Sequence, residues 1–308
     1  MRRATALVVA AGLLAVALTG CSSNPNASCD GALPSGKASD LVSATGKIGG
    51  TPKIEVPAPI DTTTSQRTIL TEGAGEKVQR NQMLEVTYSL VNGETGEVVG
   101  SSSSKQLYAT GTDAIGKGLL CAPVGSRVAI VVSAKDSGAD AGSGSPSQVY
   151  VIDVVKAFLP AANGAVRASV SGFPTVVLAP TGQPGITIPS SGGAPTKVRS
   201  ELLKQGDGAV VKKDSQIILQ YTAVGWEQKN VILTSWTNDS GDPSGPDLAD
   251  VASGQSSIQS QSQNPAVLPQ AMLKEIVGQK VGSQVVIETP KDSAFPAAAW
   301  VVDILGVR

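Results

Sequence analysis

Apolar and polar residues alternate along several short segments of this chain, as they do in β-strands that bury one face. At 84–88 every second residue is apolar, and the same order returns at 217–221. Longer apolar runs rich in β-branched residues occur at 127–133, 149–155, 284–288 and 300–305. Runs of that kind are typical of strands in the middle of a sheet. The pattern therefore predicts a β-rich fold.

Helical periodicity is clear in one segment only. Residues 270–277 place Met272, Leu273 and Ile276 on one face, and Gly278 follows as a helix-ending glycine. A shorter counterpart covers about 115–121. We expect each of these short helices to pack against a sheet.

The chain contains an internal repeat. Four landmarks recur in the same order: Ile69–Gly75 with Leu202–Gly208, Leu84–Ser89 with Ile217–Thr222, Val124–Val128 with Val281–Val285, and Tyr150–Val155 with Trp300–Leu305. The spacing from the Gly-x-Gly turn to Tyr88 in one copy equals the spacing to Tyr221 in the other. Because a repeat of this length is one folding unit, each copy predicts a domain.

The repeat sets the expected boundaries and fold class. We expect a first domain at 50–160, a linker at 161–171 and a second domain at 172–308, with a spacer and N-terminal arm at 22–49. Each domain is predicted to be α+β, a curved antiparallel sheet wrapped on one short helix.

The amino terminus has the order of a secretory signal. Arg2 and Arg3 precede an apolar run of about fifteen residues, which ends at Leu18-Thr19-Gly20-Cys21. The run is shorter than the roughly twenty residues of a membrane-spanning helix. It resembles a bacterial lipobox, which implies cleavage before Cys21 and a lipid on that cysteine. The alternative is an ordinary cleaved signal followed by an incidental cysteine.

Composition excludes several classes of function. With 24 basic and 25 acidic residues the chain has a net charge of −1, which offers no field to gather nucleic acid. It has no histidine, so it cannot build a Ser-His-Asp or Cys-His nucleophile or an imidazole zinc site. We expect no cofactor and no metal.

The two remaining cysteines are Cys29 and Cys121. Outside the cytoplasm, such a pair favours a disulfide that fastens the N-terminal arm to the first domain. The alternative is two unpaired thiols.

Two polar segments of the second copy predict exposed loops. The aspartates at 239, 242, 247 and 250 lie in a Gly/Pro-rich insertion and match no EF-hand spacing, so we expect a solvated loop rather than a calcium site. The Ser/Gln tract 253–264 also predicts a surface loop.

The ordered landmarks resemble the FKBP-type peptidyl-prolyl isomerases, and the second copy shows this best. Its motifs are Tyr221-Thr222, Ile232–Trp236, Val267-Leu268-Pro269, Gly278–Ser283, Pro290–Phe295 and Trp300. The resemblance covers about two thirds of the mature chain. It implies an aromatic-lined hollow over the helix that binds and twists prolyl amides.

By this resemblance, each candidate site residue has a role. The catalytic hollow of the second copy would be formed by Tyr221, Leu268, Met272, Phe295 and Trp300, with Leu268 near the main-chain donor for the substrate carbonyl. Substrate-binding residues would be Ile232, Trp236, Tyr88 and Tyr150. The alternative role of the strand aromatics is to fill the core.

Several positions depart from the family pattern. The pocket-floor tryptophan is replaced by Met272 and by Ile115, and Ala139 stands in place of the loop aromatic in the first copy. The Phe-Asp pair is replaced by Ile232-Leu233 and by Val99-Gly100, so the pocket aspartate is expected to be missing from both copies. The departures leave isomerase activity in question.

The sequence thus predicts a monomeric peptidyl-prolyl isomerase, lipid-anchored on the outer face of the cell membrane. Its partners would be proline-containing peptides or unfolded exported proteins. The alternative is a chaperone or peptide-binding adaptor with an FKBP-type fold and little or no catalysis. A solute-binding lipoprotein is disfavoured, because the repeat predicts two small β-rich units.

Overall fold

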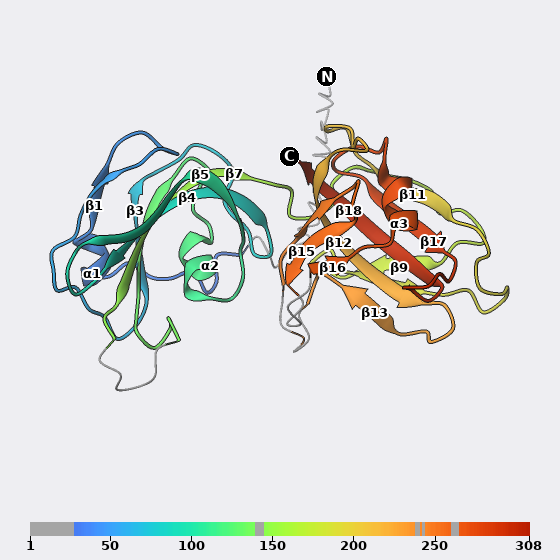
Figure 1. Cartoon of the computed structure of the whole chain (residues 1–308), viewed down its shortest axis with the longest axis horizontal. Helices are drawn as coiled ribbons and strands as arrows, with labels where there is room; N and C mark the ends of the chain where they lie inside the picture. Colours follow the sequence, from blue (N-terminus) through green and yellow to red (C-terminus); the bar gives the residue numbers. More distant parts are fainter. Residues whose placement is uncertain (1–27, 139–144, 238–240, 242–243, 260–264) are drawn as a thin grey trace, which may run out of the picture.

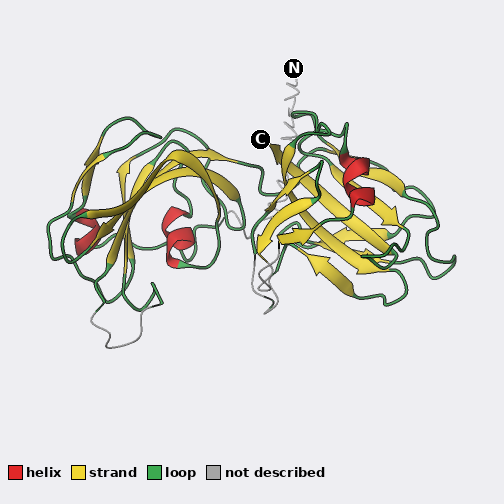
Figure 2. Cartoon of the chain, viewed as in Figure 1, coloured by secondary structure: helices red, strands yellow, loops and turns green. Residues whose placement is uncertain are grey.

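The computed structural model describes residues 28–138, 145–237, 241, 244–259 and 265–308. The predicted signal sequence with Cys21, Ala139 and the aspartates at 239 and 242 lie outside these residues. Strands make up most of the regular structure, and the helices are short (Figure 2). The strands form two large antiparallel sheets, one from each copy of the repeat (Figure 1).

The sheet of the first unit has five strands in the order β3-β6-β7-β4-β5. They are β3 (Gln66–Thr71), β6 (Arg127–Val132), β7 (Gln148–Ala157), β4 (Met83–Asn92) and β5 (Val98–Ala109). Helix α2 (Ala114–Leu119) lies in the curve of this sheet, as expected from the sequence. Its N-cap is Asp113, whose carboxylate accepts a hydrogen bond from the Gly116 main-chain N–H at 2.7 Å.

The N-terminal arm covers the other face of this sheet. It contains α1 (Lys37–Asp40) and β1 (Ser43–Thr45), and β1 pairs with β2 (Lys53–Glu55), which follows the arm. Val42 and Ile60 pack there against Val131 and Val149. The first unit therefore has an apolar core on each face of its sheet.

The sheet of the second unit follows the order β16-β15-β14-β12-β18-β17-β11-β8, with β13 also paired to β12. The strands are β8 (Ala165–Val166), β11 (Arg199–Gln205), β12 (Gln216–Gly225), β13 (Val231–Thr234), β14 (Asp247–Asp250), β15 (Gln255–Gln259), β16 (Pro265–Val267), β17 (Gln284–Thr289) and β18 (Ala298–Val307). Helix α3 (Gln270–Ile276) packs against it through Met272, Leu273 and Ile276.

A hairpin of β9 (Thr175–Leu178) and β10 (Pro184–Thr187) contacts β12 and β18 of this sheet. Ile188, Val224, Trp226 and Ala299 form a small apolar cluster in this part of the molecule. Trp226 is therefore buried and not a surface residue.

The tract 253–264 was expected to be a loop, and its first part is not. Gln255–Gln259 form β15, which pairs with β14 at Ala249 and Ser256. A serine-rich sequence forms a strand here because β14 offers a neighbouring edge, which composition does not reveal.

The landmarks of the repeat occupy equivalent places in both units. The Gly73 N–H donates to Ser126 Oγ, and the Gly206 N–H donates to Ser283 Oγ, each at 2.9 Å. A Cβ on either glycine would lie 2.2 Å from a carbonyl oxygen, that of Val124 or Val281. Glycine is needed at both turns because the main chains approach too closely for a side chain.

Apolar residues also join the two units. Met83 and Phe158 share one buried cluster with Ile218 and Leu305 of the second sheet. The Leu159 N–H donates to the Leu305 carbonyl at 3.2 Å across the same contact.

Candidate functional site

Aromatic side chains gather between α3 and the sheet of the second unit. Tyr221 projects from β12 and Trp300 from the adjacent β18, and their ring centroids are 6.1 Å apart at an interplanar angle of 52°. Phe295, in the loop before β18, meets Trp300 edge-on at 6.2 Å. Leu268 and Met272 belong to the same cluster. The structure thus brings together the five residues predicted to form the catalytic hollow.

Most of this cluster is closed to solvent. Tyr221, Leu268, Met272 and Trp300 each have 0% exposed surface. Phe295 is half-buried at the edge of the cluster, as is Ile232 on β13. Of the site residues predicted in the second unit, Phe295 and Ile232 are the two that are partly exposed.

The main-chain donor predicted at Leu268 is already engaged. Its N–H donates to the Gly254 carbonyl at 2.8 Å, in the turn that joins β14 to β15. Because a main-chain N–H is a single donor, it does not also bind a substrate carbonyl in this conformation. In this structure the Leu268 N–H is therefore not free to serve as the donor that was predicted near this residue.

A carboxylate does face the tyrosine, contrary to the expectation that both copies lack one. The Tyr221 hydroxyl donates to Asp247 Oδ2 at 3.5 Å, and Ser256 Oγ donates to the same oxygen. Asp247 is 1% exposed, so it does not lie in a solvated loop. Burial raises the pKa of Tyr221, and the negative charge of Asp247 raises it further. Tyr221 is therefore a neutral hydrogen-bond donor.

Sequence reasoning placed Asp247 in a solvated loop because it lies 26 residues from Tyr221, within a Gly/Pro-rich insertion. The segment Asp247-Leu248-Ala249-Asp250 shows no alternation of apolar and polar residues that would mark it as a strand. Such a segment fits a strand as well as a loop.

Trp236 is placed elsewhere. It is buried, but it packs near Gly182 in the turn between β9 and β10, where an added Cβ would lie 3.2 Å from the indole Cη2. It is not a member of the cluster around Tyr221.

The first unit holds a second cluster of aromatic side chains, which we call the hollow of the first unit by analogy with the predicted site. Tyr88 on β4 and Tyr150 on β7 pack at the edge of the core over α2, together with Ile115 and Tyr108. All four are only partly buried. This hollow is more open than its counterpart, although its sequence departs further from the family pattern.

Tyr108 was not predicted as a site residue. Its hydroxyl donates to both carboxylate oxygens of Asp113, at 2.7 and 2.9 Å, and Asp113 also caps α2. Burial, followed by the charge of Asp113, raises the pKa of Tyr108. The pair Tyr108–Asp113 thus places a tyrosine and a carboxylate beside this hollow, as Tyr221–Asp247 does in the second unit.

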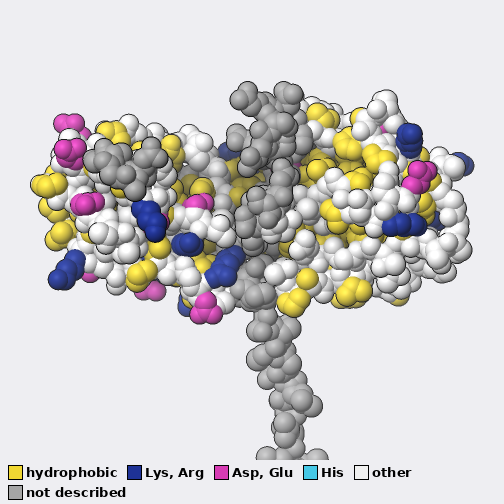
Figure 3. Space-filling view, turned by 90° about the horizontal axis from the view of Figure 1, so that it is seen from below, with side chains coloured by type: hydrophobic (Ala, Val, Ile, Leu, Met, Phe, Trp, Pro, Cys, Tyr) yellow, Lys and Arg dark blue, Asp and Glu magenta, His cyan; other side chains and the backbone are white. Residues whose placement is uncertain are grey.

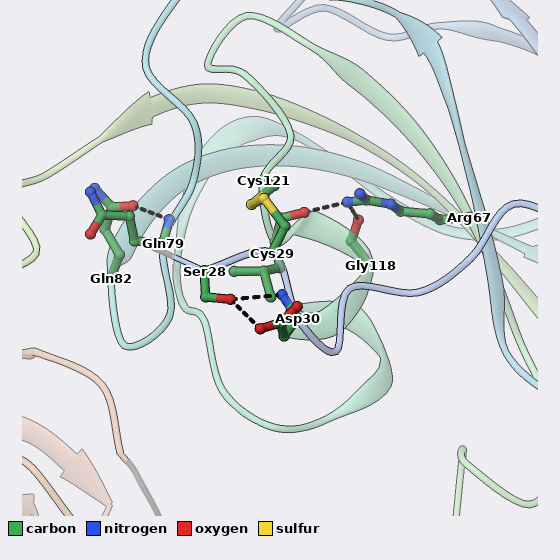
Figure 4. Close-up of a disulfide and its surroundings, with 9 residues drawn as sticks. Ser28, Cys29, Asp30, Arg67, Gln79, Gln82, Gly118 and Cys121 are labelled. Atoms are coloured by element: carbon green, nitrogen blue, oxygen red, sulfur yellow. Dashed lines mark hydrogen bonds between the residues drawn. A yellow bond between two sulfur atoms is a disulfide. The ribbon is translucent and has the colours of Figure 1, made fainter. Parts of the chain in front are cut away.

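Cys29 and Cys121 form a disulfide (Figure 4). The arm beyond it is fixed by the Leu33 N–H, which donates to the Lys117 carbonyl at 3.1 Å. The Arg67 guanidinium donates to the Gly118 carbonyl at 2.8 Å and to the Leu120 carbonyl. The disulfide and the Leu33 bond hold the arm against α2, and the Arg67 bonds join β3 to the end of the same helix.

We also searched the described residues for a metal site and for a membrane-spanning helix. No group of three potential metal-ligating side chains is found in the part of the chain that the structure describes. None of the helices placed by the structure is long and apolar enough to cross a membrane. Charged side chains of both signs are interspersed on the face seen in Figure 3.

Comparison with known proteins returned distant structural matches only. No protein-family model matches the chain, and no curated protein matches it. The solved structures to which it is similar are FKBP-type proteins. The three FKBP domains of wheat FKBP73 are 14% identical with a TM-score of 0.31, over 79% of this chain and 94% of that one.

A peptidyl-prolyl cis-trans isomerase from Pseudomonas syringae pv. tomato is 22% identical with a TM-score of 0.26, over 30% of this chain and 74% of that one. The N-terminal domain of FKBP42 from Arabidopsis thaliana is 13% identical with a TM-score of 0.27, over 36% of this chain and 98% of that one. At these TM-scores we base no argument on the matches.

Proposed function

We propose that this protein is an FKBP-type peptidyl-prolyl isomerase that acts on exported polypeptides. The observation that carries the proposal is the cluster of Tyr221, Trp300 and Phe295 over α3, with a half-buried rim. An apolar hollow is sufficient for this reaction, because the obstacle is the rotational barrier of the prolyl amide, about 18 to 20 kcal/mol. The reaction needs neither a nucleophile nor a metal.

The proposed mechanism relies on differential binding. Planarity of the amide rests on a charge-separated resonance form that water favours. Contact of the prolyl ring with Phe295 and Ile232 would remove water and weaken that form. Binding energy that is realised only with the twisted amide then lowers the barrier.

A second candidate is a peptide-binding module without catalysis. It is favoured by one observation, the engagement of the Leu268 N–H by the Gly254 carbonyl. Without that donor, a hollow can hold an apolar side chain but lacks a fixed partner for the twisted carbonyl. The half-buried tyrosines of the first unit would suit the same role.

The function is tested by proline-limited refolding of a model protein in the presence of the whole mature chain. We expect acceleration, and we expect Phe295→Ala to lower kcat/KM about tenfold, equivalent to about 1.4 kcal/mol of transition-state binding. Val177→Ala, at a position that is 69% exposed on β9, is the matched control and should leave the rate unchanged.

A refolding rate equal to that in buffer, from a chain shown to be folded, would reject the isomerase. Binding of an unfolded polypeptide that weakens in the Phe295→Ala variant would then support the peptide-binding module.

We also propose that Cys21 carries a lipid that holds the protein on the outer face of the membrane. The support is the lipobox-like sequence together with the Cys29–Cys121 disulfide, a bond that persists in oxidising compartments. Cys21→Ala should move the protein from the membrane fraction to the soluble fraction after cell lysis. A variant that stays in the membrane fraction contradicts the anchor.

A further inference from the structure

The second unit has a groove that none of the proposed site residues lines. Its volume is about 670 Å³, a size common among ligand sites. One wall is the strand β11 with its neighbour β17. The other wall is residues 167–174, which connect β8 to β9 and which we call the strap. The lining includes Glu201, Leu203 and Val286 from the sheet and Val170 and Phe173 from the strap.

The groove exists because the strap leaves the sheet early. Strand β8 pairs with β11 only at Lys204 and Gln205, and the last main-chain bond runs from the Arg167 N–H to the Leu203 carbonyl at 2.9 Å. Beyond that bond, the rest of β11 has no neighbouring strand on this side within the described part of the chain. An edge of this kind presents main-chain donors and acceptors that an added strand can satisfy.

The first unit shows what a covered edge looks like. Its equivalent strand is β3, where the Arg67 N–H donates to the Pro34 carbonyl at 2.9 Å. Gln66 Oε1 accepts from the Ala38 N–H at 3.0 Å, so the N-terminal arm is fastened along this edge. By the repeat, Ser200 corresponds to Arg67, yet no main-chain bond joins Ser200 to the strap among the described residues. The outer edge of β11 is therefore open where that of β3 is closed.

The charged and apolar side chains that line the groove determine which peptide segment it can bind. Glu201 is half-buried in the groove, and its carboxylate has no ion-pair partner within the described chain. It pairs across the sheet with Val286, so both side chains lie on the groove face. Val170 and Phe173 offer apolar contacts opposite them. Arg167 and Lys204 also line the groove, but they donate to Gln205 Oε1 and to the Ala162 carbonyl. An occupant with a basic residue above Glu201 and apolar residues beside it therefore complements this lining.

We propose that β11 and the strap bind an extended segment of another polypeptide as an added strand, with a basic side chain over Glu201. Main-chain bonding to the open edge supplies affinity, and Glu201 supplies selectivity. The inference does not depend on isomerase activity, because none of the residues proposed for the isomerase site lines the groove. The groove would give the protein a second binding site for a client polypeptide, besides the proposed isomerase site.

The probe is a short labelled peptide of alternating valine and threonine around one central lysine, and its affinity for the whole mature chain is measured by fluorescence anisotropy. The matched peptide carries glutamate at the centre. We expect the lysine peptide to bind on the order of tenfold more tightly, from attraction in one case and repulsion in the other. Neither peptide contains proline, so neither reports on the proposed isomerase site.

The decisive variant is Glu201→Lys, which should reverse the preference between the two peptides. Glu72→Lys makes the same change of charge at an exposed site of the first unit and should preserve the preference. Absence of binding, or an unchanged preference in the Glu201→Lys variant, would overturn the proposal. Loss of binding in the Phe295→Ala variant would also overturn it, by placing the peptide in the aromatic hollow. A dimer of the chain that Glu201→Lys dissociates would assign the groove to self-association instead.

Discussion

Asp153→Asn is expected to lower the free energy of unfolding of the first unit by about 3 to 5 kcal/mol, the usual cost of breaking a buried ion pair from one side. Arg127 and Asp153 are 1% and 2% exposed, and two bonds of 2.6 and 2.8 Å join them. The same guanidinium donates to the carbonyls of Gly46 and Lys47. The variant would leave a buried guanidinium without its charge partner and would loosen the segment between β1 and β2.

The repeat provides a matched residue with the opposite expectation. Asp303 occupies the place of Asp153, but Gln284 stands where the first unit has Arg127. Asp303 accepts from Gln284 Nε2 at 2.6 Å and from the Ala162 N–H at 2.9 Å. Burial outweighs these bonds and raises the pKa of Asp303 above its ordinary value of 3.8. Asp303→Asn should therefore stabilise the second unit at neutral pH.

The pH dependence follows from the direction of that shift. The folded state holds the Asp303 proton more tightly than the unfolded state, so it gains stability when the carboxyl is protonated. The contribution is complete below pH 3.8, and it is lost as the pH rises through the raised pKa of the folded state. The Asp303→Asn variant has no such proton and should lack this loss.

Both variants can be followed by urea unfolding. All three tryptophans, Trp226, Trp236 and Trp300, lie in the second unit, so indole fluorescence reports on that unit. Far-ultraviolet circular dichroism reports on both. A first unit that tolerates Asp153→Asn, or a second unit that Asp303→Asn destabilises at neutral pH, would contradict the assignment of these two carboxylates.

Removal of the disulfide is expected to have the second-largest effect. Cys29→Ser combined with Cys121→Ser should lower the unfolding free energy of the first unit by about 2 to 4 kcal/mol, because the bond closes a long loop. The two cysteines are 92 residues apart. Indole fluorescence should show an unchanged second unit in dilute denaturant. If the circular-dichroism transition of this variant falls at the same urea concentration as that of the wild type, the prediction is wrong. The other contacts of the arm would then be sufficient to stabilise the first unit.

Periodicity predicted the central strands and both packing helices, because burial of one face imposes a repeat on the residues themselves. It could not predict β15, whose polar residues pair with the edge of β14. Nor could it predict α1, a single turn whose Ala38 N–H donates to Gln66 Oε1 of β3. The aromatic cluster was predicted through the order of motifs. The Tyr221–Asp247 contact was not, since an insertion separates the partners and only the folded sheet brings them together.

The engagement of the Leu268 N–H was equally hidden from the sequence. Main-chain bonding in a turn depends on φ and ψ of several residues, and Gly254 there has φ of +77°. The amino-acid sequence around Leu268 does not show whether its main-chain N–H is free or hydrogen-bonded.

The buried contact between the units determines how the protein can be divided for study. Ile218 and Leu305 are 0% and 1% exposed, and Met83 and Phe158 cover them in the whole chain. A fragment limited to 172–308 would present those two side chains to water as an apolar patch, which favours aggregation. Keeping Phe158 and Leu159 at the start of the fragment, and replacing Ile218 with threonine, should yield a soluble second half.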